Sequence, residues 1–264
     1  HPIVAKDAMA HGVHVFTEKP VSSHYKTAVE MCGYEKTYGK KLGVCLQNRY
    51  NPSLHFLQEA IGQGLYGKLQ GIEAHVFWDR PADYYANAPW RGKEKEAGSG
   101  VILNQAVHTL DFMTLLTPML PSKVSATLRT LSDYPIEVED SVQAYFTYPD
   151  GMHGFFSATV LNHSNAPIEI SLCFEKGTLI LRGTDVFLFD GQNYEKIFSE
   201  NMLYGAKFYY GNGHKEAIRT FYQAVINNTN LYIHASDALP AMKLYEAMRL
   251  SSLFATPVLL EVLA

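Results

Sequence analysis

The sequence has few of the features that define several protein classes. It has only three cysteines in 264 residues, Cys32, Cys45 and Cys173, and none of them is part of a CxxC or a Cys/His metal motif. Such sparse cysteine use predicts reduced thiols and a cytoplasmic protein. No apolar run approaches the roughly 20 residues of a membrane-spanning helix, and the first residues lack the layout of a signal peptide. We therefore expect no membrane partner.

Neither sign of charge dominates. The 22 Lys and Arg residues stand against 26 Asp and Glu residues, a formal net charge of −4, and no block of like charges occurs. Nucleic acids attract strongly basic surfaces, so we expect no nucleic-acid partner. Sequence signatures of serine hydrolases, zinc proteases and P-loop enzymes are missing as well. The histidines show no ligand-like spacing, and we predict no metal site.

The first 46 residues alternate between helical and strand patterns. Apolar residues spaced for one helix face precede Gly12, and a second helical pattern covers residues 23–39. Short apolar runs at 13–16 and 42–46 follow these helices as buried strands. The order helix, strand, helix, strand predicts the end of a parallel α/β sheet. Two parallel strands do not stand alone, so we expect this sheet to be poorly supported unless other elements cover it.

Beyond residue 48 strands dominate. Turn signals such as Pro149-Asp150-Gly151 separate the expected strands, which we place at residues 69–78, 123–130, 141–148, 153–160, 168–174, 178–182 and 186–189. Helical patterns occupy residues 53–64, 102–116, 215–227 and 236–254. The sequence thus predicts α/β plus α+β architecture. A first domain of residues 1–47 is followed by a domain of residues 48–264 with a large, mostly antiparallel sheet covered by helices on one face.

Polar residues follow the predicted parallel strands. Glu18-Lys19-Pro20 ends the first strand, and ligands of open α/β sheets bind at the carboxyl ends of strands. Lys19 therefore points towards the expected ligand, although a lone lysine is more often a solvated surface residue. Gln47 follows the second strand, within reach of a cofactor, or else only caps a loop. Trp90-Arg91 in a later loop offers an aromatic and a cationic contact, or else a packing anchor.

A glycine-rich turn leads into a helix with three polar side chains. Asn104, His108 and Asp111 recur at i, i+4 and i+7, so we expect all three on one helix face. The glycines of Gly98-Ser99-Gly100 are expected to let the backbone approach a ligand closely. An amide, an imidazole and a carboxylate can together orient a polar substrate and move a proton near neutral pH. The alternative is a structural His108 bonded to Asp111.

Taken together, these residues resemble the Gfo/Idh/MocA oxidoreductases, the glucose–fructose oxidoreductase and inositol dehydrogenase family. The resemblance runs in order through Glu18-Lys19-Pro20, Asn48-Arg49-Tyr50-Asn51-Pro52, Trp90-Arg91, the segment 98–111 and the closing helix that begins at Ser236. It implies a Rossmann domain that binds NAD or NADP, followed by an α/β domain. The implied reaction is hydride transfer between the cofactor and a hydroxyl or keto carbon of a sugar, cyclitol or similar compound.

The resemblance also assigns roles. Lys19 resembles the lysine beside the nicotinamide and the substrate hydroxyl, and His108 resembles the family's acid/base histidine. Asn104 stands where many members carry an aspartate, so the proton role falls more heavily on His108 and Lys19. Substrate contacts are implied for Asn104, Lys19, His108 and Trp90, and cofactor contacts for Glu18, Lys19, Pro20, Gln47 and Arg91.

One part of the family pattern is missing. The family begins with a strand, a GxGxxG turn, a helix and two further strands, and this sequence contains none of them. About 60 residues are thus expected before His1, the size of two βαβ units. We expect the chain as written not to bind the dinucleotide productively, because the helix N-terminus that holds the pyrophosphate lies outside it.

Three further expectations remain. The rival to a dehydrogenase is a non-catalytic sugar-binding or oligomeric scaffold protein. A second rival keeps the cofactor but reduces a keto-sugar, or hydrolyses or eliminates through a transiently oxidised sugar. The strands also carry more apolar residues than one helix layer readily covers, which predicts a homodimer or homotetramer: Tyr145, Phe146, Phe155, Phe156, Leu172 and Phe174.

Overall fold

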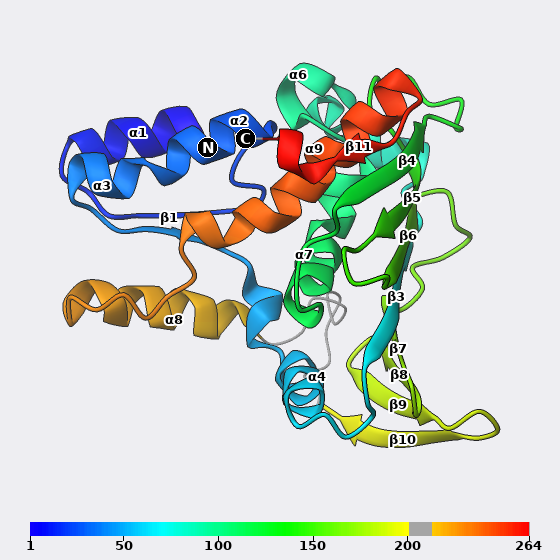
Figure 1. Cartoon of the computed structure of the whole chain (residues 1–264). Coiled ribbons are helices and arrows are strands. Elements are labelled where there is room, and N and C mark those ends of the chain that lie inside the picture. Colours follow the sequence, from blue (N-terminus) through cyan, green and yellow to red (C-terminus); the bar gives the residue numbers. More distant parts are fainter. Residues whose placement is uncertain (201–212, 264) are drawn as a thin grey trace.

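The computed structural model describes residues 1–200 and 213–263. A small sheet near the N-terminus pairs β1 (Val15–Thr17) with β2 (Leu42–Val44) in parallel. The helices α1 (Pro2–Ala10), α2 (Tyr25–Cys32) and α3 (Tyr34–Tyr38) lie on one side of it (Figure 1). The single helix expected over residues 23–39 is therefore two helices. The break falls at Gly33, a poor helix former whose N–H bonds to the Glu30 carbonyl in a tight turn.

The opposite face of the small sheet is covered by a distant part of the chain. Helix α8 (Gly213–Ile226) lies on the side away from α1 and α3 (Figure 1), and its Phe221 packs against Phe16 with ring centroids 5.1 Å apart. The outer edge of β2 is also paired, because Val44 N–H donates to the Ile233 carbonyl at 3.1 Å. Other elements thus cover both faces of the two parallel strands.

A nine-stranded sheet forms the rest of the framework. Its spatial order is β10-β9-β8-β7-β3-β6-β5-β4-β11, and β3 and β6 are its parallel pair among otherwise antiparallel neighbours. The strands are β3 (Leu69–Phe77), β4 (Lys123–Arg129), β5 (Ser141–Thr147), β6 (His153–Thr159), β7 (Glu169–Phe174), β8 (Gly177–Arg182), β9 (Asp185–Phe189), β10 (Tyr194–Ser199) and β11 (Val258–Leu259). The predicted fold class is confirmed, while β10 and β11 were not anticipated.

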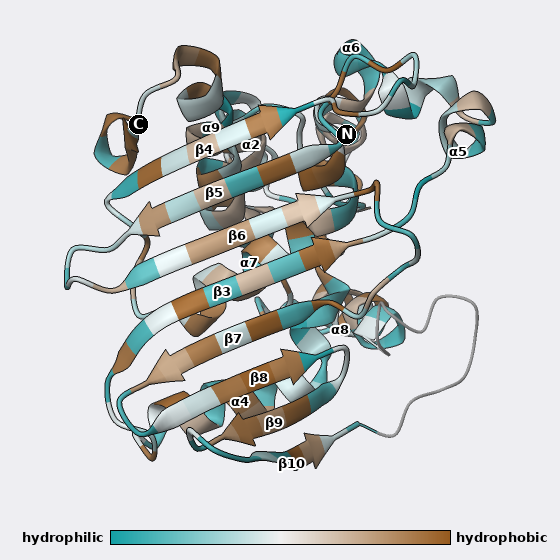
Figure 2. Ribbon diagram, turned by 90° about the vertical axis from the view of Figure 1, so that its right-hand side faces the viewer, coloured by the Kyte–Doolittle hydropathy of each residue, from teal (hydrophilic) through white to brown (hydrophobic). Residues whose placement is uncertain are grey.

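Helices cover one face of this sheet. The longer ones are α4 (Pro52–Gly62), α7 (Val107–Leu116) and α9 (Leu239–Phe254), and the short α5 (Ala82–Ala86) and α6 (Glu94–Ala97) lie in the loop after β3. In the described residues the other face carries no helix (Figure 2). None of the helices in this part of the chain has the length and apolar character needed to cross a bilayer.

The apolar surplus expected on the strands lies mostly in the core. Four of the six residues named for it, Phe146, Phe156, Leu172 and Phe174, are buried. Strand alternation explains this, because neighbours along a strand point to opposite faces: Phe146 is fully buried while Tyr145 is 46% exposed. These four residues therefore do not support an oligomer, because they already lie buried within the chain.

Candidate active site

Lys19 lies where the sequence places it, in the turn directly after β1. Its peptide bond to Pro20 is cis. The Lys19 ammonium Nζ donates a hydrogen bond to the main-chain carbonyl of Asn104 at 2.9 Å. Burial lowers the pKa of Lys19, and the negative charge of Glu18 opposes that shift. An amine with a lowered pKa exchanges its proton more readily near neutral pH, which is what proton transfer requires.

A cavity of about 620 Å³ opens beside this lysine. Arg91 forms part of its wall: the guanidinium lies 4.1 Å from the Tyr84 ring centroid and donates to the Tyr84 carbonyl at 2.9 Å. Arg91 belongs to the short helix η2 (Pro89–Gly92). Six of the predicted site residues line the cavity, together with Tyr84 and Glu96: Glu18, Lys19, Pro20, Trp90, Arg91 and Asn104.

The helix that follows the glycine-rich turn begins differently from the prediction. Residues Ile102–Ala106 form a π-helical segment, η3, before α7 begins at Val107. The wider turn changes the spacing that the prediction assumed, and the three side chains have separate partners: the Ser99 carbonyl for Asn104, Gln47 for His108 and Arg49 for Asp111. The Asn104 amide donates to the Ser99 carbonyl at 3.0 Å, and its own carbonyl receives Lys19. Asn104 thus holds Lys19 through its main chain.

The two glycines before this segment pack against the protein itself. A Cβ on Gly98, whose φ is +79°, would lie 2.2 Å from Ser23 Cβ, and one on Gly100 would lie 1.8 Å from the Glu139 carbonyl oxygen. The expected close approach to a ligand is therefore an approach to other chain segments. Glu139 also receives Ser99 Oγ at 2.5 Å and the Ile102 N–H at 3.1 Å. Nothing in the sequence marks Glu139, because it lies in a loop far along the chain.

His108 is buried on the first turn of α7, with 3% of its surface exposed. Its Nε2 lies 3.2 Å from Nε2 of Gln47, and its Nδ1 has no hydrogen-bond partner among the described residues. Burial, and then the charges of Lys19, His214 and Arg49, lower the pKa of His108 well below its usual range. The partner of His108 is thus Gln47, and the alternative of a bond to Asp111 is wrong.

Asp111 pairs instead with Arg49. The guanidinium donates to both carboxylate oxygens, at 2.8 Å from Nε and 2.7 Å from Nη2, and Nη2 also donates to the Asp237 carbonyl at 2.6 Å. Arg49 belongs to the short helix η1 (Gln47–Tyr50) and Asp237 to η5 (Ala235–Ala238). This bidentate pair fastens α7 to the end of the small sheet. The guanidinium of Arg49 thus joins α7 to η5 as well as to the end of β2.

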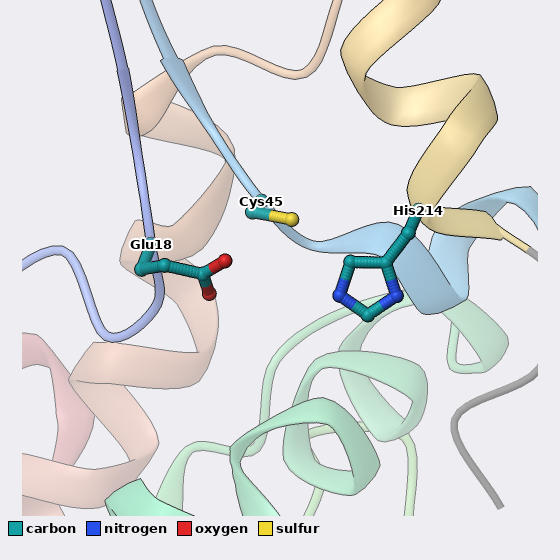
Figure 3. A group of neighbouring side chains, drawn as sticks. All are labelled: Glu18, Cys45 and His214. Atoms are coloured by element: carbon teal, nitrogen blue, oxygen red, sulfur yellow. The ribbon is translucent and has the colours of Figure 1, made fainter. Parts of the chain in front are cut away.

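Three further groups meet beside Lys19. Glu18, Cys45 and His214 come from the ends of β1 and β2 and the start of α8, and their polar atoms lie within 4.8 Å of one another (Figure 3). Burial and then the charge of Glu18 raise the pKa of Cys45 to about 12, so the thiol keeps its proton. These residue types are found in metal sites, but a cation there would have to displace that proton and lie near Lys19. Their positions along the chain gave no signal of this group.

Two family models match the chain. One, described as an oxidoreductase family with an NAD-binding Rossmann fold, matches residues 1–46, and the other, the GFO/IDH/MocA C-terminal domain, matches residues 54–180. The Rossmann match covers β1, Lys19 and β2, and Gln47 directly follows its last residue.

Characterised relatives agree with these matches. Mouse trans-1,2-dihydrobenzene-1,2-diol dehydrogenase is 27% identical over 64% of this chain and 48% of its own length. The D-xylose dehydrogenase of Paenarthrobacter nicotinovorans is 27% identical over 57% of this chain and 39% of its own length. The chain thus spans about half or less of these two relatives. The WlbA dehydrogenase of Bordetella pertussis, solved with NADH and UDP-GlcNAcA, is 26% identical with a TM-score of 0.82, over 98% of this chain and 75% of that one.

Proposed function

Because this chain belongs to the GFO/IDH/MocA oxidoreductase family, we propose that the protein transfers a hydride between NAD or NADP and a hydroxyl or keto carbon of a sugar, cyclitol or similar diol. The observation that carries the proposal is one juxtaposition. A partly buried lysine lines a cavity at the carboxyl end of β1, and its positive charge contributes to the lowered pKa of His108, a buried histidine whose Nδ1 has no partner in the described residues. We take Lys19 and His108 as the catalytic residues.

The residues present fit a nicotinamide and a polyol. His108 is not one of the residues that line the cavity, but its buried Nδ1 has no hydrogen-bond partner in the described residues, and we propose that a substrate oxygen supplies one. The cavity also offers Trp90 for the apolar face of a sugar ring, and Arg91 and Glu96 for its hydroxyls. When bound, an oxidised nicotinamide supplies the acceptor for the hydride, and this chain's residues then handle the proton.

The roles of the chain's own groups follow from their surroundings. Lys19 is held by the Asn104 carbonyl at 2.9 Å, so its Nζ stays in place whether or not it is charged. Its lowered pKa lets it take up the hydroxyl proton as an alcohol becomes a ketone. Glu18, Pro20, Gln47 and Arg91 are proposed to contact the cofactor, and Asn104 and Trp90 the substrate.

Three broader parts of the proposal concern the whole protein. We propose that residues 1–47 belong to the dinucleotide-binding domain and residues 48–264 to the substrate domain. The helix-free face of the large sheet, with Tyr145 and Phe77 46% and 37% exposed, is proposed to join two or four copies. Sedimentation showing only monomers at micromolar concentration would contradict this.

We also propose a cytoplasmic location, because the three free thiols suit a reducing compartment.

The test is turnover of the full protein with NAD and NADP against a panel of sugars, cyclitols and diols. Lys19→Met and His108→Ala should each lower kcat about 100-fold or more, because the first removes the group that takes up the hydroxyl proton and the second removes a group proposed to bind the substrate oxygen. Lys68→Met, which replaces an exposed lysine, is the matched control. Full activity in both site variants would refute the assignment. Sugar binding without any nicotinamide-linked turnover would favour a binding or scaffold protein instead. A product with no net redox change would favour the transiently oxidised route.

A further inference from the structure

Gln47 lies between Cys45 and His108 in the buried layer next to Lys19. All three side chains are nearly inaccessible, with 2%, 2% and 3% of their surfaces exposed. The Cys45 thiol donates to Gln47 Oε1 with Sγ and oxygen 3.7 Å apart, and Gln47 Nε2 lies 3.2 Å from His108 Nε2. An amide nitrogen only donates hydrogen bonds, so His108 Nε2 is the acceptor of this one.

That contact fixes the position of the imidazole proton. A neutral imidazole carries one proton, and a ring nitrogen that accepts a hydrogen bond carries none. The proton of neutral His108 is therefore on Nδ1, the buried atom without a partner in the described residues. The positive groups that act on the ring, Lys19, His214 and Arg49, favour the neutral form. His108 thus presents a donor, not an acceptor, at its free nitrogen.

The Cys45 thiol explains why the Gln47 amide has this orientation. A rotation about the last side-chain torsion would exchange the amide oxygen and nitrogen and reverse the bond to His108. A protonated thiol needs an acceptor, and the Gln47 oxygen supplies one only in the observed orientation. The Cys45 thiol stays protonated because burial and the charge of Glu18 disfavour the thiolate. Glu18 is the competing acceptor beside the thiol (Figure 3).

We propose that Cys45 and Gln47 are positioning residues that hold neutral His108 with its proton on Nδ1, so that this histidine donates a hydrogen bond to the substrate oxygen while Lys19 takes up the hydroxyl proton. The hydrogen bond to a substrate oxygen rests on the proposed function, whereas the position of the imidazole proton follows from the contacts of Gln47 alone. In the oxidation of an alcohol, the O–H proton moves to uncharged Lys19 Nζ, and the hydride leaves the carbon for the oxidised nicotinamide. His108 gains and loses no proton in this step.

Nitrogen NMR of the full protein, labelled with ¹⁵N-histidine, measures the tautomer directly. His108 resonances are assigned by their loss in His108→Asn. We expect Nδ1 at the shift of a protonated ring nitrogen and Nε2 at that of a non-protonated one, in the absence of substrate. A protonated Nε2 with a bare Nδ1 would overturn the proposal.

Variants of the two positioning residues sharpen the test. Gln47→Glu replaces the donor by a carboxylate, which accepts, so the proton should move to Nε2, and kcat should fall about 100-fold. Cys45→Ala removes the thiol donor, so both tautomers should appear, while Cys45→Ser keeps a donor and should restore Nδ1–H. Cys173→Ala, on β7, is the control for the loss of a thiol and should leave the spectrum unchanged.

The outcomes separate this proposal from the proposed function. An unchanged tautomer in Gln47→Glu, or in Cys45→Ala, would contradict the positioning role even if the enzyme were fully active. An Nδ1–H tautomer that responds to both variants, in a protein without nicotinamide-linked turnover, would support the positioning role and refute the proposed function. If Gln47→Glu does not fold, the comparison of Cys45→Ala with Cys45→Ser still decides.

Discussion

The two sheets of this protein bury their residues in different ways. The small parallel sheet has three-residue strands enclosed between α1 to α3 on one side and α8 on the other. The nine-stranded sheet is covered on one face and bare on the other, so its strands alternate between core and surface. Lys19 and Gln47 follow the strands of the small sheet, while the large sheet supports α7 and His108. The proposed site therefore combines residues from both sheets, and its geometry depends on how the two sheets pack against each other.

Substitutions of two adjacent residues on β5 test whether only one face of the large sheet is buried. Phe146→Ala removes a fully buried ring, and we expect the free energy of unfolding to fall by about 4 kcal/mol. Tyr145→Ala changes the adjacent side chain, which is 46% exposed, and should cost less than about 1 kcal/mol in the monomer. Urea denaturation of both variants measures the difference. Equal losses would mean that a partner or segment covers the second face.

Two strand glycines probe the enclosure of the small sheet. A Cβ on Gly43 of β2 would meet the Phe221 ring at 2.7 Å and the Phe16 ring at 2.9 Å, whereas one on Gly71 of β3 would find its nearest atom at 3.4 Å. Gly43→Ala should therefore destabilise the protein by about 2 kcal/mol and Gly71→Ala by little or nothing. Thermal melts of the two variants make the comparison. An unchanged melting temperature in Gly43→Ala would show that α8 does not pack tightly against β2.

The pH dependence of stability reports on the junction between the sheets. Folded His108 stays neutral because burial lowers its pKa, but in the unfolded chain it takes up a proton below about pH 6.5. The unfolded state then binds more protons, so the free energy of unfolding falls as pH decreases, by about 1.4 kcal/mol per pH unit for this residue. Denaturation between about pH 5 and 6.5 should show a shallower slope in His108→Asn. His11→Asn, at the exposed end of α1, should keep the wild-type slope.

Local patterns predicted most of the fold and part of the site. Lys19 could be placed because it follows an apolar strand, and strand ends are where open α/β sheets bind ligands. The π-helical segment Ile102–Ala106 could not be predicted, because such a turn leaves no mark in an apolar helix pattern. The partner of His108 was also mistaken. Asp111 is three residues from His108 in the sequence and Gln47 is 61 residues away. Tertiary packing nevertheless brings the distant Gln47 into contact with the imidazole.

Because α8 packs on the small sheet, β1 and β2 are synthesised long before the helix that covers one of their faces. Glu35 and His234, which bond to each other beside β2, are 199 positions apart in the chain. At roughly 5–20 residues per second, a ribosome needs about 10 to 40 s to make that interval. Phe16 and Gly43, which the Phe221 ring of α8 covers in the finished molecule, stay uncovered on that face until then. For that interval this apolar face of β1 and β2 is open to water and to chaperones that bind exposed apolar segments.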